Sequence, residues 1–413
     1  MRNKISAVII DPEKSKHDYS TITVQDDWVY GFPYGEHGFD ITVLTTTDNI
    51  LSELNKAKGF DCLITIGNNI NMGPLNALSF EFRKKWIHEE SFNGPEIAKH
   101  IVNVFLYNVN RIRENNVKLF SIFTCTFNTS KTQFERLYNS IKNQTYPNWN
   151  WYILDDSTNP ATVDMINHYH DPRVVVIKNI SNHGNIGFNK HLVASICDGD
   201  YLVEVDHDDE LLPNCLELLH KAFTTYPDTD FVYSHAMELV NNKEVYYGNN
   251  FAYGLGEYRD IEIQGIKRHI ALTAQVNAVS VRGIHALPNH VRCWKKEFYH
   301  KIGGHNIELS VLDDMDILIR TFLHGKMTLV DTVLYIQHEG ENITRKNGST
   351  AQSHRFDEIQ RTNEYLRRVY DKEIHNRLIE LGVEDPIWIE EYQRSDIRLP
   401  KTNLINVNYI LKP

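Results

Sequence analysis

Strand-like and helix-like segments alternate between residues 118 and 206, and this order constrains the fold more than any other feature of the chain. LFSIFTCTF (119–127), NWYIL (150–154), RVVVI (173–177) and DYLVEV (200–205) have the apolar runs of buried strands. Between the first two, Phe134, Leu137, Tyr138 and Ile141 follow the spacing of an amphipathic helix. Helices are also expected near 161–169 and around Phe188. This order predicts a mostly parallel α/β sheet flanked by helices, whose ligands bind beyond the carboxyl ends of the strands.

The rest of the chain divides around this series. Residues 1–116 contain KISAVIID, FDITVLTT, NILSELNKAKG and DCLITIG, which predict a smaller N-terminal α/β domain of open role. A polar stretch at 111–118 has the composition of a linker. HRFDEIQRTNEYLRRVY, after residue 350, indicates a helical C-terminal extension. We therefore expect domains at 1–116, 117–348 and 349–413.

Composition limits the partners and the compartment. The 43 Lys and Arg residues against 54 Asp and Glu give a net charge of -11, which disfavours nucleic acid and anionic lipid surfaces as partners. No apolar run reaches the roughly 18 residues of a membrane span, and no secretory leader is evident. Five cysteines without C-x-x-C spacing argue against a disulfide framework. A cytoplasmic protein without a transmembrane segment is expected.

An acidic cluster follows the strand DYLVEV. The sequence VEVDHDDELLP places Asp206, Asp208 and Asp209 at the exit of that strand. Clustered carboxylates repel one another unless a cation or hydrogen-bond donors compensate. Such hard oxygen ligands suit Mg²⁺ or Mn²⁺, which take further ligands from substrate phosphates. The alternative is a solvated acidic turn before a helix.

Residues 118–346 resemble the GT-A-type (Rossmann-like) catalytic domain of glycosyltransferase family 2. The resemblance is carried by SIFTCTFN, SIKNQTYPNWNWYILDDST, NHGNIGFNK and DGDYLVEVDHDDELLP, and it continues through WKKEFYHKIGGHN, LDDMDILIRTFLHG and YIQHEGENIT. It covers neither the N-terminal domain nor the C-terminal helices. It implies an inverting transferase that uses a nucleotide-sugar donor.

On the donor side, the resemblance assigns roles to residues that follow the early strands. Asp156 would contact the base, typically uracil, although an Asx turn is the alternative. Asp206 would lie near the ribose and metal, and Asp208 would ligate Mn²⁺ or Mg²⁺ at the diphosphate. His338 would complete the metal shell. The remaining implied nucleotide contacts are Cys125, Thr126, Asn128 and Asn189. Where the family often has an arginine, this chain has Phe188, so His183 and Asn185 are further candidates.

On the acceptor side, the resemblance identifies Asp314 as the general base that takes a proton from the acceptor hydroxyl. Asp313 stands before it where the family more usually has Glu, and both acids would open a helix whose apolar face includes Met315 and Leu318. Helix capping is the alternative. Trp294 could stack on an acceptor sugar or pack in the core, and Arg345 could lie on a lid over the diphosphate or on a solvated loop.

The expected reaction is transfer of a sugar from a nucleoside-diphosphate sugar, UDP above all, to an acceptor hydroxyl of a glycan, a lipid-linked glycan or a protein. Two other functions stay open. One is a metal-dependent nucleotidyl or phosphoryl transferase, which would use the acidic site but not the LDDMD helix. The other is a transferase-like protein that binds glycan or nucleotide without turnover. Neither the sugar nor the acceptor follows from the sequence.

Overall fold

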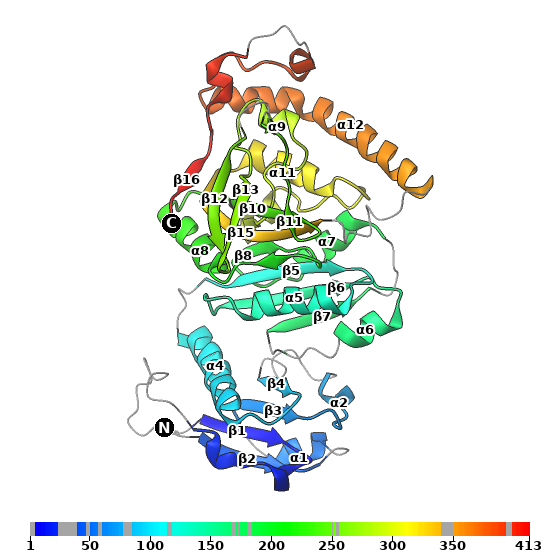
Figure 1. Cartoon of the computed structure of the whole chain (residues 1–413), viewed down its shortest axis with the longest axis vertical. Coiled ribbons are helices and arrows are strands. Elements are labelled where there is room, and N and C mark those ends of the chain that lie inside the picture. The colour runs from blue at the N-terminus through cyan, green and yellow to red at the C-terminus, as the bar shows by residue number, and fades with distance from the viewer. Residues whose placement is uncertain are drawn as a thin grey trace. The chain divides into compact units, whose positions relative to one another are not determined.

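The computed structural model describes residues 5–23, 39–46, 50–56, 60–76, 85–113, 118–166, 171, 173–179, 184–249, 251–252, 256–339, 350–393 and 399–413. The chain forms two compact units (Figure 1). The first comprises Met1–Val117 with Asp164–Val175, and the second comprises Lys118–Val163 with Val176–Pro413.

The first unit is built on a parallel sheet of order β2-β1-β3-β4. Its strands are β1 (Ile5–Ile10), β2 (Phe39–Leu44), β3 (Cys62–Ile66) and β4 (Trp86–Glu89). Its helices are α1 (Ile50–Lys56), α2 (Gly73–Asn76) and α4 (Gly94–Arg113). Apolar residues of β1 and β3 alternate between two clusters, because successive side chains of a strand point to opposite faces. One cluster contains Ile97 and Ile101 of α4, and the other contains Ile50 of α1.

The second unit contains a larger sheet of order β16-β15-β10-β14-β8-β5-β6-β7. In chain order these strands are β5 (Phe120–Thr126), β6 (Trp149–Asp155), β7 (Val174–Lys178), β8 (Tyr201–Glu204), β10 (Phe231–Val240), β14 (Arg292–Lys295), β15 (Met327–Glu339) and β16 (Tyr409–Leu411). Short strands β9 (Glu210–Leu211) and β11 (Lys243–Glu244) pair with β15 and β10. A separate hairpin consists of β12 (Tyr258–Ile263) and β13 (Ile266–Ala271).

Strand β14 makes this sheet mixed. It runs antiparallel to both neighbours, β10 and β8, whereas β8-β5, β5-β6, β10-β15 and β15-β16 are parallel. Because β14 is reversed between them, β8 and β10 still point the same way. The expected α/β architecture is confirmed, with one reversed strand near its centre.

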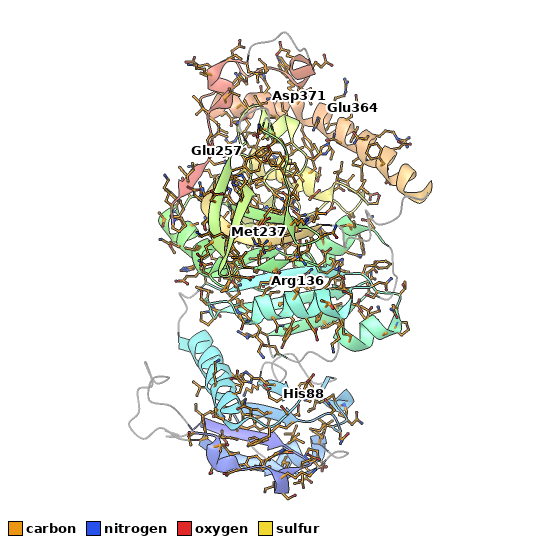
Figure 2. All side chains as sticks on the ribbon, viewed as in Figure 1. His88, Arg136, Met237, Glu257, Glu364 and Asp371 are labelled. Atoms are coloured by element: carbon orange, nitrogen blue, oxygen red, sulfur yellow. The ribbon has the colours of Figure 1, made fainter. Side chains whose placement is uncertain are left out.

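Seven further α-helices precede the long C-terminal helix of the second unit in the described part of the chain. They are α5 (Lys131–Lys142), α6 (Pro160–Ile166), α7 (Ile186–Ser195), α8 (Cys215–Thr225), α9 (Ser280–Gly283), α10 (Lys296–Lys301) and α11 (Asp313–His324). Helix α5 begins at a capping box between Ser130 and Gln133, which satisfies amide groups of the first turn. Its Phe134 stacks on Trp151 of β6 with ring centroids 5.7 Å apart. Arg136 also lies on this helix (Figure 2). Its guanidinium donates a hydrogen bond to the backbone carbonyl of Asp208.

The C-terminal segment packs on this second unit. Helix α12 (Thr350–Glu380) contributes Asp371, whose Oδ1 accepts a hydrogen bond from the buried Arg282 of α9 at 2.6 Å. Strand β16 then pairs with β15, so the tail adds an outer strand to the sheet. Among the described residues, no helix combines the length and the apolar composition that a membrane crossing requires.

Candidate active site

The candidate functional residues gather at one edge of the large sheet because of its strand directions. The parallel strands β5, β6, β8, β10 and β15 end at this edge, which brings the residues after them together. Strand β14 is antiparallel, so its first residue, Arg292, and the preceding His290 lie at the same edge. Segments separated by more than a hundred residues thereby meet.

The acidic segment after β8 is held in a defined geometry. The backbone N–H of Asp206 donates to the Tyr335 hydroxyl oxygen at 3.1 Å, and that hydroxyl donates to Asp209 Oδ2 at 2.8 Å. Asp209 Oδ1 accepts from the backbone N–H of His338 at 2.8 Å. Burial, together with the charges of Asp208 and Asp206, raises the pKa of Asp209 well above its usual value. Asp209 therefore fixes the segment instead of offering a free carboxylate.

Asp208 differs from Asp209 in its partners. Its carboxylate is buried, and Oδ2 has no hydrogen-bond partner within the described part of the chain. Its backbone carbonyl accepts a hydrogen bond from Arg136. Burial raises the pKa of Asp208, with the charge of Asp206 adding to this and His207 opposing it. A buried carboxylate oxygen without a partner is costly, and a cation would compensate it.

The imidazole of His338 points to another acid. Its Nε2 lies 2.8 Å from Glu210 Oε1, and Glu210 is also 4.0 Å from Arg136 Nε. The histidine that does reach Asp206 is His290, whose Nε2 lies 3.4 Å from Asp206 Oδ2 and whose ring stacks on Tyr335. Sequence reasoning did not identify His290.

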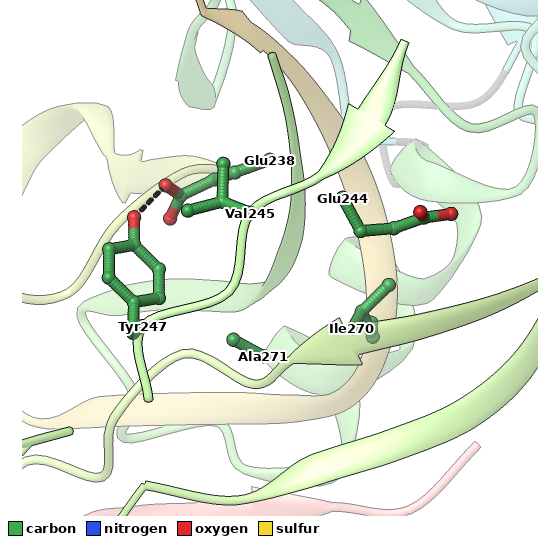
Figure 3. A pocket seen from close by; sticks show the side chains of 6 residues that line it. All are labelled: Glu238, Glu244, Val245, Tyr247, Ile270 and Ala271. Carbon is green, nitrogen blue, oxygen red and sulfur yellow. Dashed lines mark hydrogen bonds between the residues drawn. The ribbon is translucent and has the colours of Figure 1, made fainter. Parts of the chain in front are cut away.

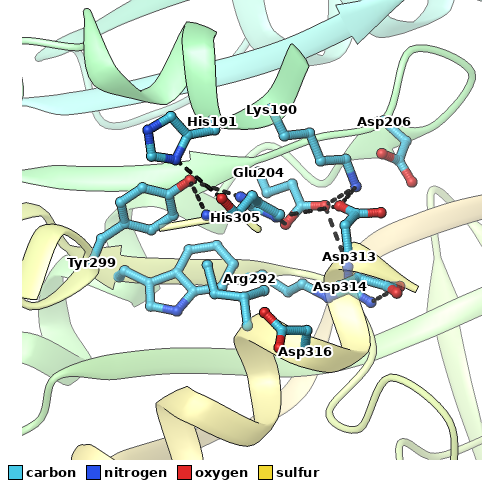
Figure 4. Close-up of polar contacts among 12 residues, drawn as sticks. Lys190, His191, Glu204, Asp206, Arg292, Tyr299, His305, Asp313, Asp314 and Asp316 are labelled. Atoms are coloured by element: carbon cyan, nitrogen blue, oxygen red, sulfur yellow. Dashed lines mark hydrogen bonds and ion pairs between the residues drawn. The ribbon is translucent and has the colours of Figure 1, made fainter. Parts of the chain in front are cut away.

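Glu204, the last residue of β8, is the centre of a buried charge network (Figure 4). Lys190 Nζ lies 2.6 Å and Arg292 Nη1 3.3 Å from Glu204 Oε1, and His305 Nε2 is 3.5 Å from Oε2. Burial by itself would lower the pKa of Lys190. The negative charges of Asp313 and Glu204 outweigh burial and raise this pKa well above its ordinary value. All four residues are buried or nearly so.

None of these four residues was among the sequence candidates. One signal was available for Glu204: it is a charged residue at the end of the apolar run predicted as the strand DYLVEV, and a buried charge requires a partner of opposite sign. Lys190 stands on α7 beside Asn189, within a motif that the resemblance already covered.

The two acids that open α11 have different environments. Asp313 is 5% exposed, with Lys190 Nζ at 3.5 Å and His305 Nε2 at 3.7 Å from its Oδ2. Asp314 is 26% exposed, and its Oδ2 lies 3.2 Å from Arg292 Nη2 while Oδ1 accepts from the Met315 backbone N–H at 2.8 Å. Burial raises the pKa of Asp313, although Lys190 and His305 oppose the shift. Only Asp314 of this pair is accessible to a substrate hydroxyl.

The nucleotide-side candidates surround the ends of β5 and β6. The Asp156 carboxylate is buried and accepts from three donors: Asn179 Nδ2 at 2.7 Å, Asn189 Nδ2 at 3.0 Å and the Gly184 N–H at 3.2 Å. The Asp156 carboxylate therefore links the start of α7 to the sheet, and the Asn189 side-chain amide is used as one of its hydrogen-bond donors. Asn179 was missed from the sequence.

The ends of β5 and β6 are joined by further hydrogen bonds. Thr126 Oγ1 donates to Asp155 Oδ1 at 3.1 Å. Asn128, at a positive φ of 50°, accepts from the backbone N–H groups of Thr158 and Asn159 on Oδ1. Cys125 is partly exposed at the end of β5 and is not in a disulfide. These contacts set the shape of the edge where a nucleotide would lie.

Two further sequence expectations concerned Trp294 and Arg345. Trp294 is fully buried in β14, where its Nε1 donates to Thr321 Oγ1 at 2.9 Å and its ring contacts Phe231 and Tyr299. The suggestion that it stacks on a sugar is wrong, because neither ring face is accessible; core packing accounts for it. Arg345, with the lid suggested for it, lies outside the described residues, as does His183.

One group of described side chains at this edge could hold a divalent cation. Ligand atoms of Glu204, Asp206 and His290 lie within 4.8 Å of one another. Glu204, however, already contacts Lys190 and Arg292, and a third cation there would be repelled by both. Asp206, together with the unpartnered Oδ2 of Asp208, gives the hard oxygen donors that Mg²⁺ or Mn²⁺ prefers.

Two curated proteins are similar in sequence to parts of this chain. An uncharacterized glycosyltransferase of Haemophilus influenzae is 26% identical over 212 residues, which are 51% of this chain and 64% of that protein. The Escherichia coli protein UDP-Glc:alpha-D-GlcNAc-diphosphoundecaprenol beta-1,3-glucosyltransferase WfaP is 32% identical over 93 residues, 22% of this chain and 36% of its own length. The matched segments span less than two thirds of the first curated relatives.

Among solved structures, Staphylococcus aureus TarS 1–349 in complex with UDP-GlcNAc is similar with a TM-score of 0.46 and 16% identity, covering 63% of this chain and 71% of that one. The family model described as Glycosyl transferase family 2 matches residues 121–285, which include most of β5, Asp156, Lys190 and the acidic segment. The chain thus carries, over these residues, a domain of glycosyl transferase family 2.

Proposed function

We propose that this protein is an inverting glycosyltransferase that moves a sugar from a UDP-sugar to an acceptor hydroxyl, with Asp314 as general base. The observation that carries the proposal is the accessibility of Asp314 beside the buried Asp313, together with its contact to Arg292. A base must reach the acceptor hydroxyl, and Asp313 is covered. Because Asp314 opens α11 at the edge that carries Asp206, the acceptor oxygen would be deprotonated next to the donor sugar.

The donor would lie along the ends of β5, β6 and β8. Cys125, Thr126 and Asn128 supply backbone and side-chain groups there, and Asp156 with Asn189 holds the entry of α7 against them. The name of the relative WfaP specifies a UDP-sugar, which supports UDP as the nucleotide. Lys190 and Arg292 are paired with Glu204, and in this proposal they would lend positive charge near the leaving diphosphate.

Asp206 and Asp208 are the residues that we propose hold a divalent cation, with His290 beside Asp206. Mn²⁺ or Mg²⁺ bound there would neutralise charge developing on the leaving diphosphate. His338 belongs to this site through its backbone contact with Asp209, which fixes the acidic segment.

The experiment is release of nucleoside diphosphate from a panel of sugar nucleotides with and without Mn²⁺, comparing wild type with Asp314→Asn. The matched control is Asp331→Asn. Asp331 is similarly exposed, at 20%, and is likewise paired with an arginine, Arg259, at 2.9 Å, but it lies outside the site. Asp314→Asn should lower transfer at least about a thousandfold while donor binding is kept.

The outcomes separate the alternatives. Pyrophosphate release would favour a nucleotidyl transferase, and stabilisation by a nucleotide without turnover would favour a binding protein. Equal activity of Asp314→Asn and Asp331→Asn would refute the role of Asp314. The anomeric configuration of the product, read by NMR, tests inversion.

A further inference from the structure

A cluster of aromatic side chains lies on the β12–β13 hairpin and on the loop that follows β11. It comprises Tyr246, Tyr247, Phe251, Tyr258 and His269, which we call the aromatic surface. The Tyr246 and Tyr258 rings stack with centroids 5.2 Å apart, and Tyr258 stacks on His269 at 5.1 Å. Tyr246 and Tyr247 are 62% and 48% exposed. Two large rings therefore present surface to solvent while their neighbours hold the segment in place.

A small pocket of about 10 Å³, room for about one water molecule, lies beside Tyr247 (Figure 3), so a sugar would cover its mouth and not enter it. Its lining combines apolar side chains with two carboxylates: Glu238, Glu244, Val245, Tyr247, Ile270 and Ala271. The Tyr247 hydroxyl donates a hydrogen bond to Glu238 Oε2, which fixes the ring next to the carboxylate. A sugar ring has an apolar C–H face and several hydroxyls. An aromatic side chain beside hydrogen-bonding groups can contact both.

This pocket is connected to the candidate active site through Asn289. Its Nδ2 lies 3.0 Å from Glu238 Oε1 and 3.1 Å from Gln337 Oε1, which joins the ends of β10 and β15. The next residue, His290, reaches Asp206. A continuous run of polar groups therefore leads from the acidic segment to the aromatic surface.

The register of the sheet gives the separation between the two places. Tyr233 of β10 pairs with Arg292, and Arg292 pairs with Glu204. Glu238 lies five residues farther along β10, which is on the order of 16 Å of strand at about 3.3 Å per residue. A sugar in contact with Tyr247 would therefore be a distal unit of a chain whose terminal hydroxyl reaches Asp314.

We infer that the aromatic surface and the pocket at Glu238 form an acceptor subsite for an oligosaccharide chain of uncharged sugars. This inference rests on the proposed transferase function. The C–H face of a sugar ring would pack on Tyr247, and its hydroxyls would donate to the Glu238 carboxylate, which Asn289 holds in place. Two carboxylates in the lining, with Arg268 paired to Glu244 at 2.8 Å, disfavour an acidic sugar at this position.

The test is binding of the full chain to an array of immobilised neutral oligosaccharides, uronate-bearing oligosaccharides and monosaccharides. Tyr247→Ala removes the ring, whereas Tyr247→Phe keeps the ring and loses the hydroxyl. Tyr365→Ala is the matched control, since Tyr365 is a tyrosine on α12 with 62% exposure. Thermal melting of each variant checks that the fold is kept.

Wild type, Tyr247→Phe and Tyr365→Ala should bind neutral oligosaccharides, and Tyr247→Ala should bind them about tenfold more weakly. Unchanged binding by Tyr247→Ala, binding confined to uronates or to monosaccharides, or no binding by wild type would overturn the subsite. Donor hydrolysis without acceptor is measured in the same preparations. If no donor is hydrolysed while glycan binding depends on Tyr247, the transferase proposal fails and the subsite stands. If a donor is hydrolysed but glycan binding does not depend on Tyr247, the subsite fails and the transferase proposal stands.

Discussion

Arg292 Nη2 lies 3.2 Å from Asp314 Oδ2, while Nη1 of the same guanidinium lies 3.3 Å from Glu204 Oε1. One buried side chain therefore connects the proposed base to the carboxylate at the centre of the charge network. Lys190 extends the connection from Glu204 to Asp313, the residue before the base. The orientation of Asp314 thus depends on residues from β8, β14 and α7.

Replacing Arg292 with lysine should lower kcat by about 10- to 100-fold. Lysine keeps the positive charge, but a single ammonium cannot reproduce the planar fork that contacts two carboxylates at once. The measurement is nucleoside diphosphate release under saturating donor. Arg259→Lys is the control, because Arg259 pairs with Asp331 outside the site. If both variants turned over at the wild-type rate, Asp314 would not depend on Arg292 for its position.

Replacing Asp208 with asparagine should abolish the stabilisation that Mn²⁺ gives to the wild-type protein. A ligand that binds only the folded state raises its stability according to concentration over Kd, so loss of a metal ligand removes that increment. In EDTA the variant should melt no lower than wild type, because an amide replaces a buried carboxylate whose Oδ2 has no described partner. Thermal melts with and without MnCl₂ provide the measurement.

Asp228→Asn serves as the control for this pair of melts, since Asp228 is an exposed partner of Lys326. An undiminished Mn²⁺ shift in Asp208→Asn would mean that the cation is held elsewhere at this edge.

Sequence patterns predicted the part of the sheet whose strands lie close to one another along the chain. Apolar runs of β5, β6 and β8 indicated parallel strands, and Asp156 and Asp206 were expected at one edge for that reason. The position of β14 could not be predicted, because RCWK is too short for a periodicity and its pairing with β8 and β10 joins distant segments. With β14 came Arg292 in the site and Trp294 in the core. The sequence could not decide between core packing and sugar contact for Trp294, because tryptophan occurs in both roles.

Gly187→Ala should reduce both stability and activity. A Cβ at this position would meet the Asn306 carbonyl oxygen at 2.2 Å and the Leu309 carbonyl oxygen at 2.7 Å, and Asp313 Cβ at 3.2 Å. The first turn of α7 therefore packs directly on the segment that leads into α11. Relief of the clash should cost about 1–3 kcal/mol of unfolding free energy and displace the start of α11, which carries Asp314.

Chemical denaturation and the transfer assay together measure this effect. Ser195→Ala, at the exposed end of α7, is the control and should be neutral in both. A stable Gly187→Ala protein with wild-type turnover would show that the α7 contact does not determine the position of the base.

Stability should fall as the pH drops below about 6.5, and His235 should account for part of the loss. Burial lowers the pKa of His235, and its contact with Asp331, at 3.1 Å from Nε2, offsets only part of that shift. The folded state then binds this proton less readily than the unfolded chain, whose histidine titrates near 6.5. This histidine therefore costs no stability above that pH, and it lowers the unfolding free energy by up to about 1.4 kcal/mol per pH unit as the pH falls toward the folded pKa.

His235→Gln, which keeps a donor for Asp331, should show a shallower dependence of unfolding free energy on pH between pH 7 and pH 5, measured by urea denaturation. The slope should decrease by at most the amount that corresponds to one bound proton. His269→Gln, at an exposed histidine, should keep the wild-type slope; identical slopes in all three proteins would assign the acid sensitivity to other groups.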